Sequence, residues 1–162
     1  MRRLSAVVSV LITLGSAAFA QNDAATKKFL TQAIEGNYAE VSMGDLAQKN
    51  GQSDGVKSFG KMLSTDHDAA NQKATDAAKS IGITPPTGPN AKQKADYSKM
   101  SKTSGIDFDK MFATHMIADH QKDIAEYKKA SKMKDAAGEY ASGEVDTLQK
   151  HLGTAKSLRP SR

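Results

Sequence analysis

The chain has no cysteine and no tryptophan, and only 6% of its 162 residues are aromatic. The absence of cysteine excludes disulfide bonds, thiolate metal sites, cysteine nucleophiles and a lipid-modified cysteine at a processed N-terminus. A Gly-rich phosphate loop, a nucleophile elbow and a Ser/His/Asp arrangement are missing as well. The sequence therefore predicts no catalytic residue and no organic cofactor, and it does not identify a substrate.

An excess of charge of one sign is also missing. Lys and Arg number 23 against 18 Asp and Glu, which gives a net charge of +5. Arg2 and Arg3 lie in a segment that we expect to be removed, and without them the charge is +3. This balance is too mild to predict nucleic-acid binding. An envelope protein or an anionic surface remains open as a partner.

The first twenty residues, Met1 to Ala20, have the pattern of a secretory signal peptide. Two arginines precede an apolar run from Leu4 to Leu14, and the small residues of Ala18-Phe19-Ala20 end the segment. This pattern favours cleavage after Ala20 and export to the periplasm of a bacterium. A membrane anchor is the alternative, but the run is well short of the roughly 20 residues that a bilayer span needs.

Four later segments repeat apolar residues at steps of three and four, which is typical of helices that bury one face. Asn22 or Asp23 is expected to cap the first helix, Asn50-Gly51 to end it, and Ser53 to cap the second. The expected helices cover about residues 22–49, 53–82, 107–130 and 136–158.

The segment from Ile83 to Gly105 contains Pro85, Pro86 and Pro89 and a helix-compatible patch from Lys92 to Met100. We expect it to be a long connector. Four helices with two tight turns and one long connection predict an all-α, antiparallel four-helix bundle over residues 21–162. Coiled-coil heptads are the alternative, but the apolar stripes break at each turn and contain many alanines, which favours an intramolecular bundle.

Each of the four stripes is interrupted by one residue that can bind a metal ion: Glu40, His67, His120 and His151. One ligand from each helix is how bundles build metal sites in their interior. Three imidazoles and a carboxylate suit zinc, copper, iron or manganese better than magnesium or calcium. The sequence therefore predicts one transition metal ion in the bundle.

The level of each residue along the bundle follows from its distance to the nearest turn at about 1.5 Å per residue. Glu40 and His67 then lie about one helical turn apart. His120 and His151 are separated by roughly 7 Å, so Glu144 is a closer match to the level of His120. Glu144 therefore joins the predicted ligands.

A buried layer of hydrogen-bonded polar groups without a metal is the main alternative, and exposed histidines are a second one. Burial of Glu40 beside three imidazoles with neither a metal nor a proton would cost several kcal/mol. His115 is about 140° around the helix from His120, so it is expected to pack at the surface. Asp66 and Asp119 are candidates for orienting an imidazole, although solvated surface acids are the favoured interpretation.

Several short segments match a known pattern: 29–30 with 39–40, 44–47, 56–59 with 66–67, 105 with 108–109 and 120, and 151. Together they resemble the secreted, ferritin-like bacterial family catalogued as domain of unknown function 4142. The resemblance implies a ferritin-like bundle in the periplasm or at the outer membrane, for which no reaction is established. Within it, Glu40, His67, His120 and His151 match the polar pattern.

A ferritin-type di-iron centre needs two Glu-x-x-His pairs. The residues three positions before His67, His120 and His151 are not carboxylates, so oxidation of iron is not expected. We expect metal binding for buffering, sensing or stress protection in the envelope. One alternative is an envelope interaction module whose buried histidines hold no metal. A third hypothesis is an enzyme that uses a carboxylate and an imidazole as acid and base, but no motif supports it.

Overall fold

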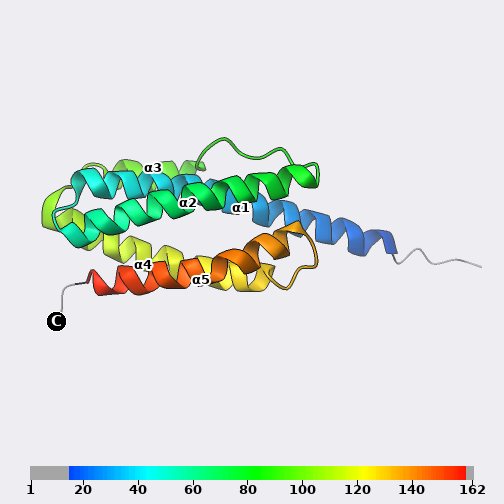
Figure 1. The fold of residues 1–162 in the computed structure, drawn as a ribbon. Coiled ribbons are helices and arrows are strands. Elements are labelled where there is room, and N and C mark those ends of the chain that lie inside the picture. Colours follow the sequence, from blue (N-terminus) through cyan, green and yellow to red (C-terminus); the bar gives the residue numbers. More distant parts are fainter. Residues whose placement is uncertain (1–14, 160–162) are drawn as a thin grey trace, which may run out of the picture.

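A computed structural model of the chain describes residues 15–159, with side chains from residue 24 onward. The predicted signal peptide therefore lies outside the described residues up to residue 14. The described part is all-helical, as expected, and its only β-type contact is an isolated bridge between Gly51 and Gly105. No helix in it is long and apolar enough to span a membrane. The helices are α1 (Gly15–Asn50), α2 (Asp54–Ser80), α3 (Ala91–Met100), α4 (Gly105–Ala130) and α5 (Ala136–Ser157) (Figure 1).

The expected count of four helices is not confirmed, because part of the long connector forms α3. Its start is a capping box. The Asn90 side chain accepts a hydrogen bond from the Gln93 backbone N–H at 3.0 Å, and the Gln93 side chain accepts one from the Asn90 backbone N–H at 2.8 Å. This reciprocal pair satisfies two donors that a short helix would otherwise leave open.

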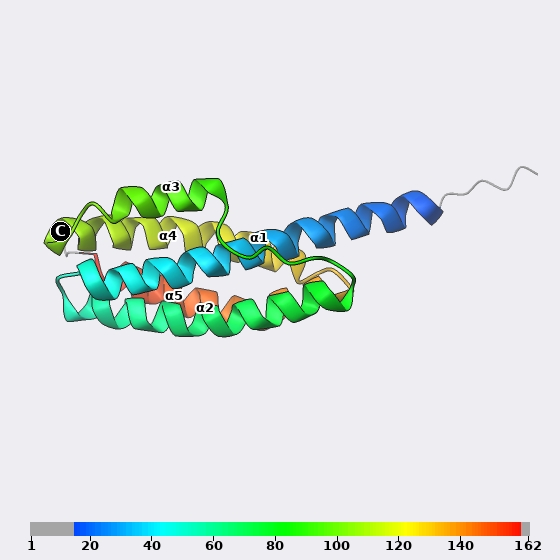
Figure 2. The same ribbon diagram turned by 90° about the horizontal axis from the view of Figure 1, so that it is seen from above.

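The predicted start of the first helix at Asn22 or Asp23 is wrong. In the structure, α1 begins at Gly15 and continues through both residues without interruption. Five alanines lie between residues 16 and 26, with no glycine or proline, so the local sequence favours a continuous helix. This end of α1 projects beyond the other helices (Figures 1 and 2). The predicted starts of the helices near residues 54, 105 and 136 agree with the structure to within two residues.

Two glycines bring α1 and α2 into direct backbone contact. A Cβ atom added at Gly44 would lie 2.5 Å from the Gly60 carbonyl oxygen, and one added at Gly60 would lie 2.6 Å from the Gly44 carbonyl oxygen. Neither position has room for a side chain. The close approach fixes the level of α1 against α2, and with it the levels of Glu40 and His67.

The molecule consists of two antiparallel helix pairs, α1 with α2 and α4 with α5, joined mainly through contacts between α2 and α5. Contacts between α1 and α4 are sparser, and α3 lies along this side against both of them (Figure 2). Asp109 of α4 also ties the two pairs together, because its carboxylate accepts hydrogen bonds from the Gln52 and Ser53 backbone N–H groups at 2.9 Å. A cavity of about 280 Å³, lined mainly by residues of α1, α3 and α4, lies on this side.

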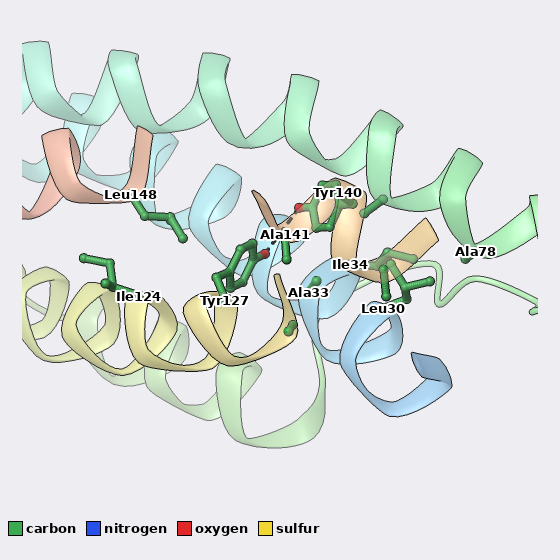
Figure 3. Close-up of a cluster of buried hydrophobic side chains, with 12 residues drawn as sticks. Leu30, Ala33, Ile34, Ala78, Ile124, Tyr127, Tyr140, Ala141 and Leu148 are labelled. Carbon is green, nitrogen blue, oxygen red and sulfur yellow. Dashed lines mark hydrogen bonds between the residues drawn. The ribbon is translucent and has the colours of Figure 1, made fainter. Parts of the chain in front are cut away.

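A central polar layer divides the buried apolar residues into two clusters. The Tyr140 cluster, drawn in Figure 3, comprises Leu30, Ala33, Ile34, Ala74, Ala78, Ile124, Tyr127, Ala130, Ala137, Tyr140, Ala141 and Leu148. The Phe59 cluster comprises Met43, Leu46, Ala47, Val56, Phe59, Leu63, Met100, Phe108, Phe112, Met116, Ile117 and Ala155. The central polar layer comprises Asn37, Glu40, His67, Asn71, His120, Glu144 and His151, all buried.

Candidate metal centre

Three helices bring three buried histidines together in the central polar layer. His67 comes from α2, His120 from α4 and His151 from α5. One ring nitrogen of each lies within 4.8 Å of the other two. The ring centroids are 5.8 Å apart for His67 and His120, 5.3 Å for His67 and His151, and 5.4 Å for His120 and His151. The rings therefore surround one point in the interior.

Hydrogen bonds on the far side of two rings define which nitrogen carries the proton. Nδ1 of His120 lies 3.0 Å from the carbonyl oxygen of Met116, which can only accept, so Nδ1 donates. Nδ1 of His67 lies 2.9 Å from Oδ1 of Asn37. The Asn37 amide donates from Nδ2 to the Tyr140 hydroxyl at 3.0 Å, which directs Oδ1 toward the imidazole. In both rings Nε2 is then the nitrogen with a free lone pair, and Nε2 of His67 has no hydrogen-bond partner.

The third ring has its outer nitrogen on a carboxylate. Nε2 of His151 donates to Oδ2 of Asp66 at 2.9 Å, while its Nδ1 lies 3.3 Å from Nε2 of His120. If both rings are neutral, two lone pairs face each other across this short distance. The contact becomes favourable either when His151 takes a second proton or when a cation accepts both lone pairs.

Burial keeps two of the imidazoles neutral at physiological pH. It lowers the pKa of His67 well below 6.5, and the neighbouring His120 and His151 lower it further. Burial and then His151 lower the pKa of His120 to about 4, although the bond to the Met116 carbonyl acts in the opposite direction. A neutral imidazole is the form that binds a metal ion, so these two rings have free lone pairs at neutral pH.

The two predicted carboxylate ligands lie outside the group of three histidines. Glu40 is 5% exposed and its Oε2 atom has no hydrogen-bond partner. Burial raises its pKa well above 4.5, and the charges of Asp123 and Asp119 raise it further. Glu144 accepts a hydrogen bond from Lys73 Nζ at 2.9 Å. Burial thus favours the protonated form of Glu40, and Glu144 has a lysine partner.

His120 and His151 are closer than the roughly 7 Å that counting residues along the helices predicts, because Nε2 of His120 lies 3.3 Å from Nδ1 of His151. The level match between Glu144 and His120 stays a prediction. Side chains on a helix lean toward its N-terminus. On the antiparallel pair α4 and α5, His120 therefore leans away from the connecting turn and His151 leans toward it, which closes the gap of about 7 Å that the rise per residue predicts.

The residues that orient the rings were only partly predicted. Asp66 was favoured as a surface acid, and its side chain is 41% exposed, but it bonds His151 of another helix. Asp119 pairs with His115 at 3.1 Å and is not among the hydrogen-bond partners of the three clustered histidines. Asn37 and Tyr140 were missed. An amide on the buried face of the first helix, three residues before Glu40, was the available signal for Asn37.

Comparison with known proteins adds a family but no described function. No curated protein and no solved structure gives a significant match to the chain. Residues 13–158 match the family described as "Domain of unknown function (DUF4142)", which is most of the chain and agrees with the resemblance seen in the sequence. The chain therefore belongs to the DUF4142 family.

Proposed function

We propose that the protein binds one transition metal ion through His67 Nε2, His120 Nε2 and His151 Nδ1. The observation that carries the proposal is the hydrogen-bond pattern of the three rings: the opposite nitrogen of each ring faces an acceptor, namely Asn37 Oδ1, the Met116 carbonyl oxygen or Asp66 Oδ2. Such partners fix the tautomer and the direction of a metal-binding imidazole.

The donor set favours zinc, copper, iron or manganese over magnesium or calcium, because imidazole nitrogen suits the transition metals. Three protein ligands would leave a coordination position free for water or a small molecule. Glu40 and Glu144 as further ligands stay predictions. The bound ion would also lie between the two lone pairs of His120 and His151 and remove their repulsion.

The proposed setting is the periplasm, after cleavage of the signal peptide behind Ala20. The four long helices would there act as a ferritin-like four-helix bundle that carries the metal for buffering, sensing or stress protection. The positions three residues before the histidines contain Ser64, Ile117 and Leu148, so a di-iron centre is not part of the proposal.

The test is elemental analysis of the mature chain, purified without a histidine tag and incubated separately with zinc, copper, iron and manganese salts. We expect about one ion per chain for at least one of these metals, and loss of that ion in the His67→Ala/His120→Ala variant. His115→Ala is the matched control, since His115 pairs with Asp119 at the surface, and it should bind like the wild type. A wild type that stays metal-free with all four salts would overturn the proposal and favour an envelope interaction module.

A further inference from the structure

A cavity of about 280 Å³ lies beside the histidines, on the side where α3 covers α1 and α4 (Figure 2). His67 is the only one of the three clustered histidines that lines it. Acidic side chains outnumber basic ones in its wall. The acids are Glu40, Asp96, Asp119, Asp123 and Glu126; the basic side chains are Lys92 and Lys122, together with the imidazoles of His67 and His115.

Both lysines and His115 have a carboxylate partner other than Glu40, and the remaining basic side chain, His67, is kept neutral by burial, which lowers its pKa. Lys92 pairs with Asp96 at 2.6 Å, and His115 pairs with Asp119 at 3.1 Å. Lys122 lies 3.9 Å from Asp123 and 3.7 Å from Glu126, with its own side chain 68% exposed. Glu40 therefore faces the cavity without a cation among the described residues.

Glu40 is the group that points to a ligand. Its side chain is buried, its Oε2 atom has no hydrogen-bond partner, and it lines the cavity. Asp123 and Asp119 are near enough for their charges to act on it. Burial also raises the pKa of Asp123 to about 7. A buried carboxyl oxygen without a hydrogen-bond partner, in a cavity wall that contains other carboxylates, is a group that a bound cation would satisfy.

We propose that this cavity is a second cation site, in which Glu40 and Asp123 bind a divalent metal ion through their carboxylate oxygens. Asp119 adds negative charge beside them. The ligand set is oxygen rather than nitrogen, so the site favours hard ions such as manganese, magnesium or calcium. The proposal goes beyond the histidine centre and does not depend on it, because His120 and His151 do not line the cavity.

The test is titration with Mn²⁺ at pH 7.5, followed by the loss of the electron paramagnetic resonance signal of free Mn²⁺. Two forms of the protein are compared: the wild type loaded first with one equivalent of zinc, and a His120→Ala/His151→Ala variant whose cavity wall is intact. Both should bind one Mn²⁺ per chain. Glu40→Gln and Asp123→Asn should each weaken this binding at least tenfold, which corresponds to about 1.4 kcal/mol.

Glu126→Gln is the matched control, because Glu126 lines the same cavity but its side chain is 45% exposed. It should bind Mn²⁺ like the wild type. Equal Mn²⁺ binding by Glu40→Gln and the wild type would overturn the proposal. An equally large loss of Mn²⁺ binding in Glu126→Gln and in Glu40→Gln would also overturn it, because such a result indicates diffuse binding to surface acids. Glutamine has the shape of the protonated Glu40 side chain, so this variant should fold, and circular dichroism would verify it. If the protein binds no zinc but still binds Mn²⁺ in a way that depends on Glu40, the histidine centre is rejected and the cavity site stands.

Discussion

The Phe59 cluster and the central polar layer are neighbours on the same helices, and they satisfy their buried groups in opposite ways. In the cluster, Phe59 and Phe112 pack edge to face with ring centroids 5.9 Å apart, and Phe108 stacks on Phe112 at 5.6 Å. In the layer, Glu40, His67 and Asn71 each keep one buried side-chain atom without a hydrogen-bond partner. Within residues 24–159 these three atoms are the whole set of this kind, and all belong to the layer.

This difference indicates that the Phe59 cluster stabilises the fold, whereas the central polar layer is arranged to bind a ligand. Native interiors satisfy nearly all of their buried polar groups, because each group left open costs about 1–3 kcal/mol. A continuous apolar core would avoid this cost. The layer therefore weakens the metal-free protein, and we expect changes in the cluster to act on stability and changes in the layer to act on metal binding.

The largest effect on stability should come from the cluster. Phe112→Ala removes a fully buried ring and should lower the free energy of unfolding by about 3–5 kcal/mol. Zinc affinity of the folded fraction should change little, because Phe112 is outside the polar layer. Urea unfolding and zinc titration would measure the two effects. A loss of zinc binding without a loss of stability would break the comparison.

Metal binding in the polar layer should raise the free energy of unfolding of the protein by a similar amount. At a free metal concentration of 1,000 times the Kd, binding to the folded state alone adds about 4 kcal/mol. The melting temperature should therefore rise when the metal is added and fall again with a chelator. His67→Ala/His120→Ala should show no rise, and His115→Ala should show the full one. An equal rise in the double variant would place the bound metal elsewhere.

Most of the fold could be predicted from the sequence, because apolar spacing and caps are local signals. Ser53 was expected to cap the second helix and accepts a hydrogen bond from the Val56 backbone N–H at 3.3 Å. The start of the first helix was missed, because the alanine-rich residues before Asn22 lack a signal that ends a helix. The additional helix, α3, was visible in the sequence only as a short helix-compatible patch within the connector.

The site was predictable to the level of residue types on a helix face. The three histidines were found because each interrupts an apolar stripe. Their direct contacts were not, since these depend on the direction in which side chains lean. The bond between Asp66 and His151 was also hidden, because its partners are 85 residues apart and belong to different helices.

The amide that orients His67 offers a smaller test of the layer. Asn37→Leu keeps the side-chain shape but removes the acceptor for Nδ1 of His67, and it should weaken metal binding about tenfold to a hundredfold. Tyr140→Phe leaves Asn37 in place and removes only the hydroxyl that holds its amide, so its effect should be smaller. Competition with a chromogenic chelator would measure both. Unchanged affinity in Asn37→Leu would mean that the protein does not use this bond to position the ring.

Glu40 gives the smallest effect on stability, and the size of this effect depends on pH. As the pH rises above 4.5, a carboxyl whose pKa burial raises well above this value keeps its proton in the folded chain but ionises in the unfolded chain. Unfolding then releases a proton, so this group makes stability fall as pH rises, by up to about 1.4 kcal/mol per pH unit. Glu40→Gln removes this contribution. The stability of the variant relative to the wild type should therefore increase as the pH rises above 4.5, as measured by urea unfolding of metal-free protein.

The same experiment in saturating Mn²⁺ separates a desolvated acid from a ligand. A cation in the cavity would replace the proton on Glu40, so the wild type should no longer lose stability relative to Glu40→Gln as the pH rises. Parallel curves for the two proteins without metal would show that Glu40 ionises in the folded state. In that case the polar layer would contain a solvated carboxylate at this position, and its contrast with the apolar clusters would rest on the histidines and Asn71 alone.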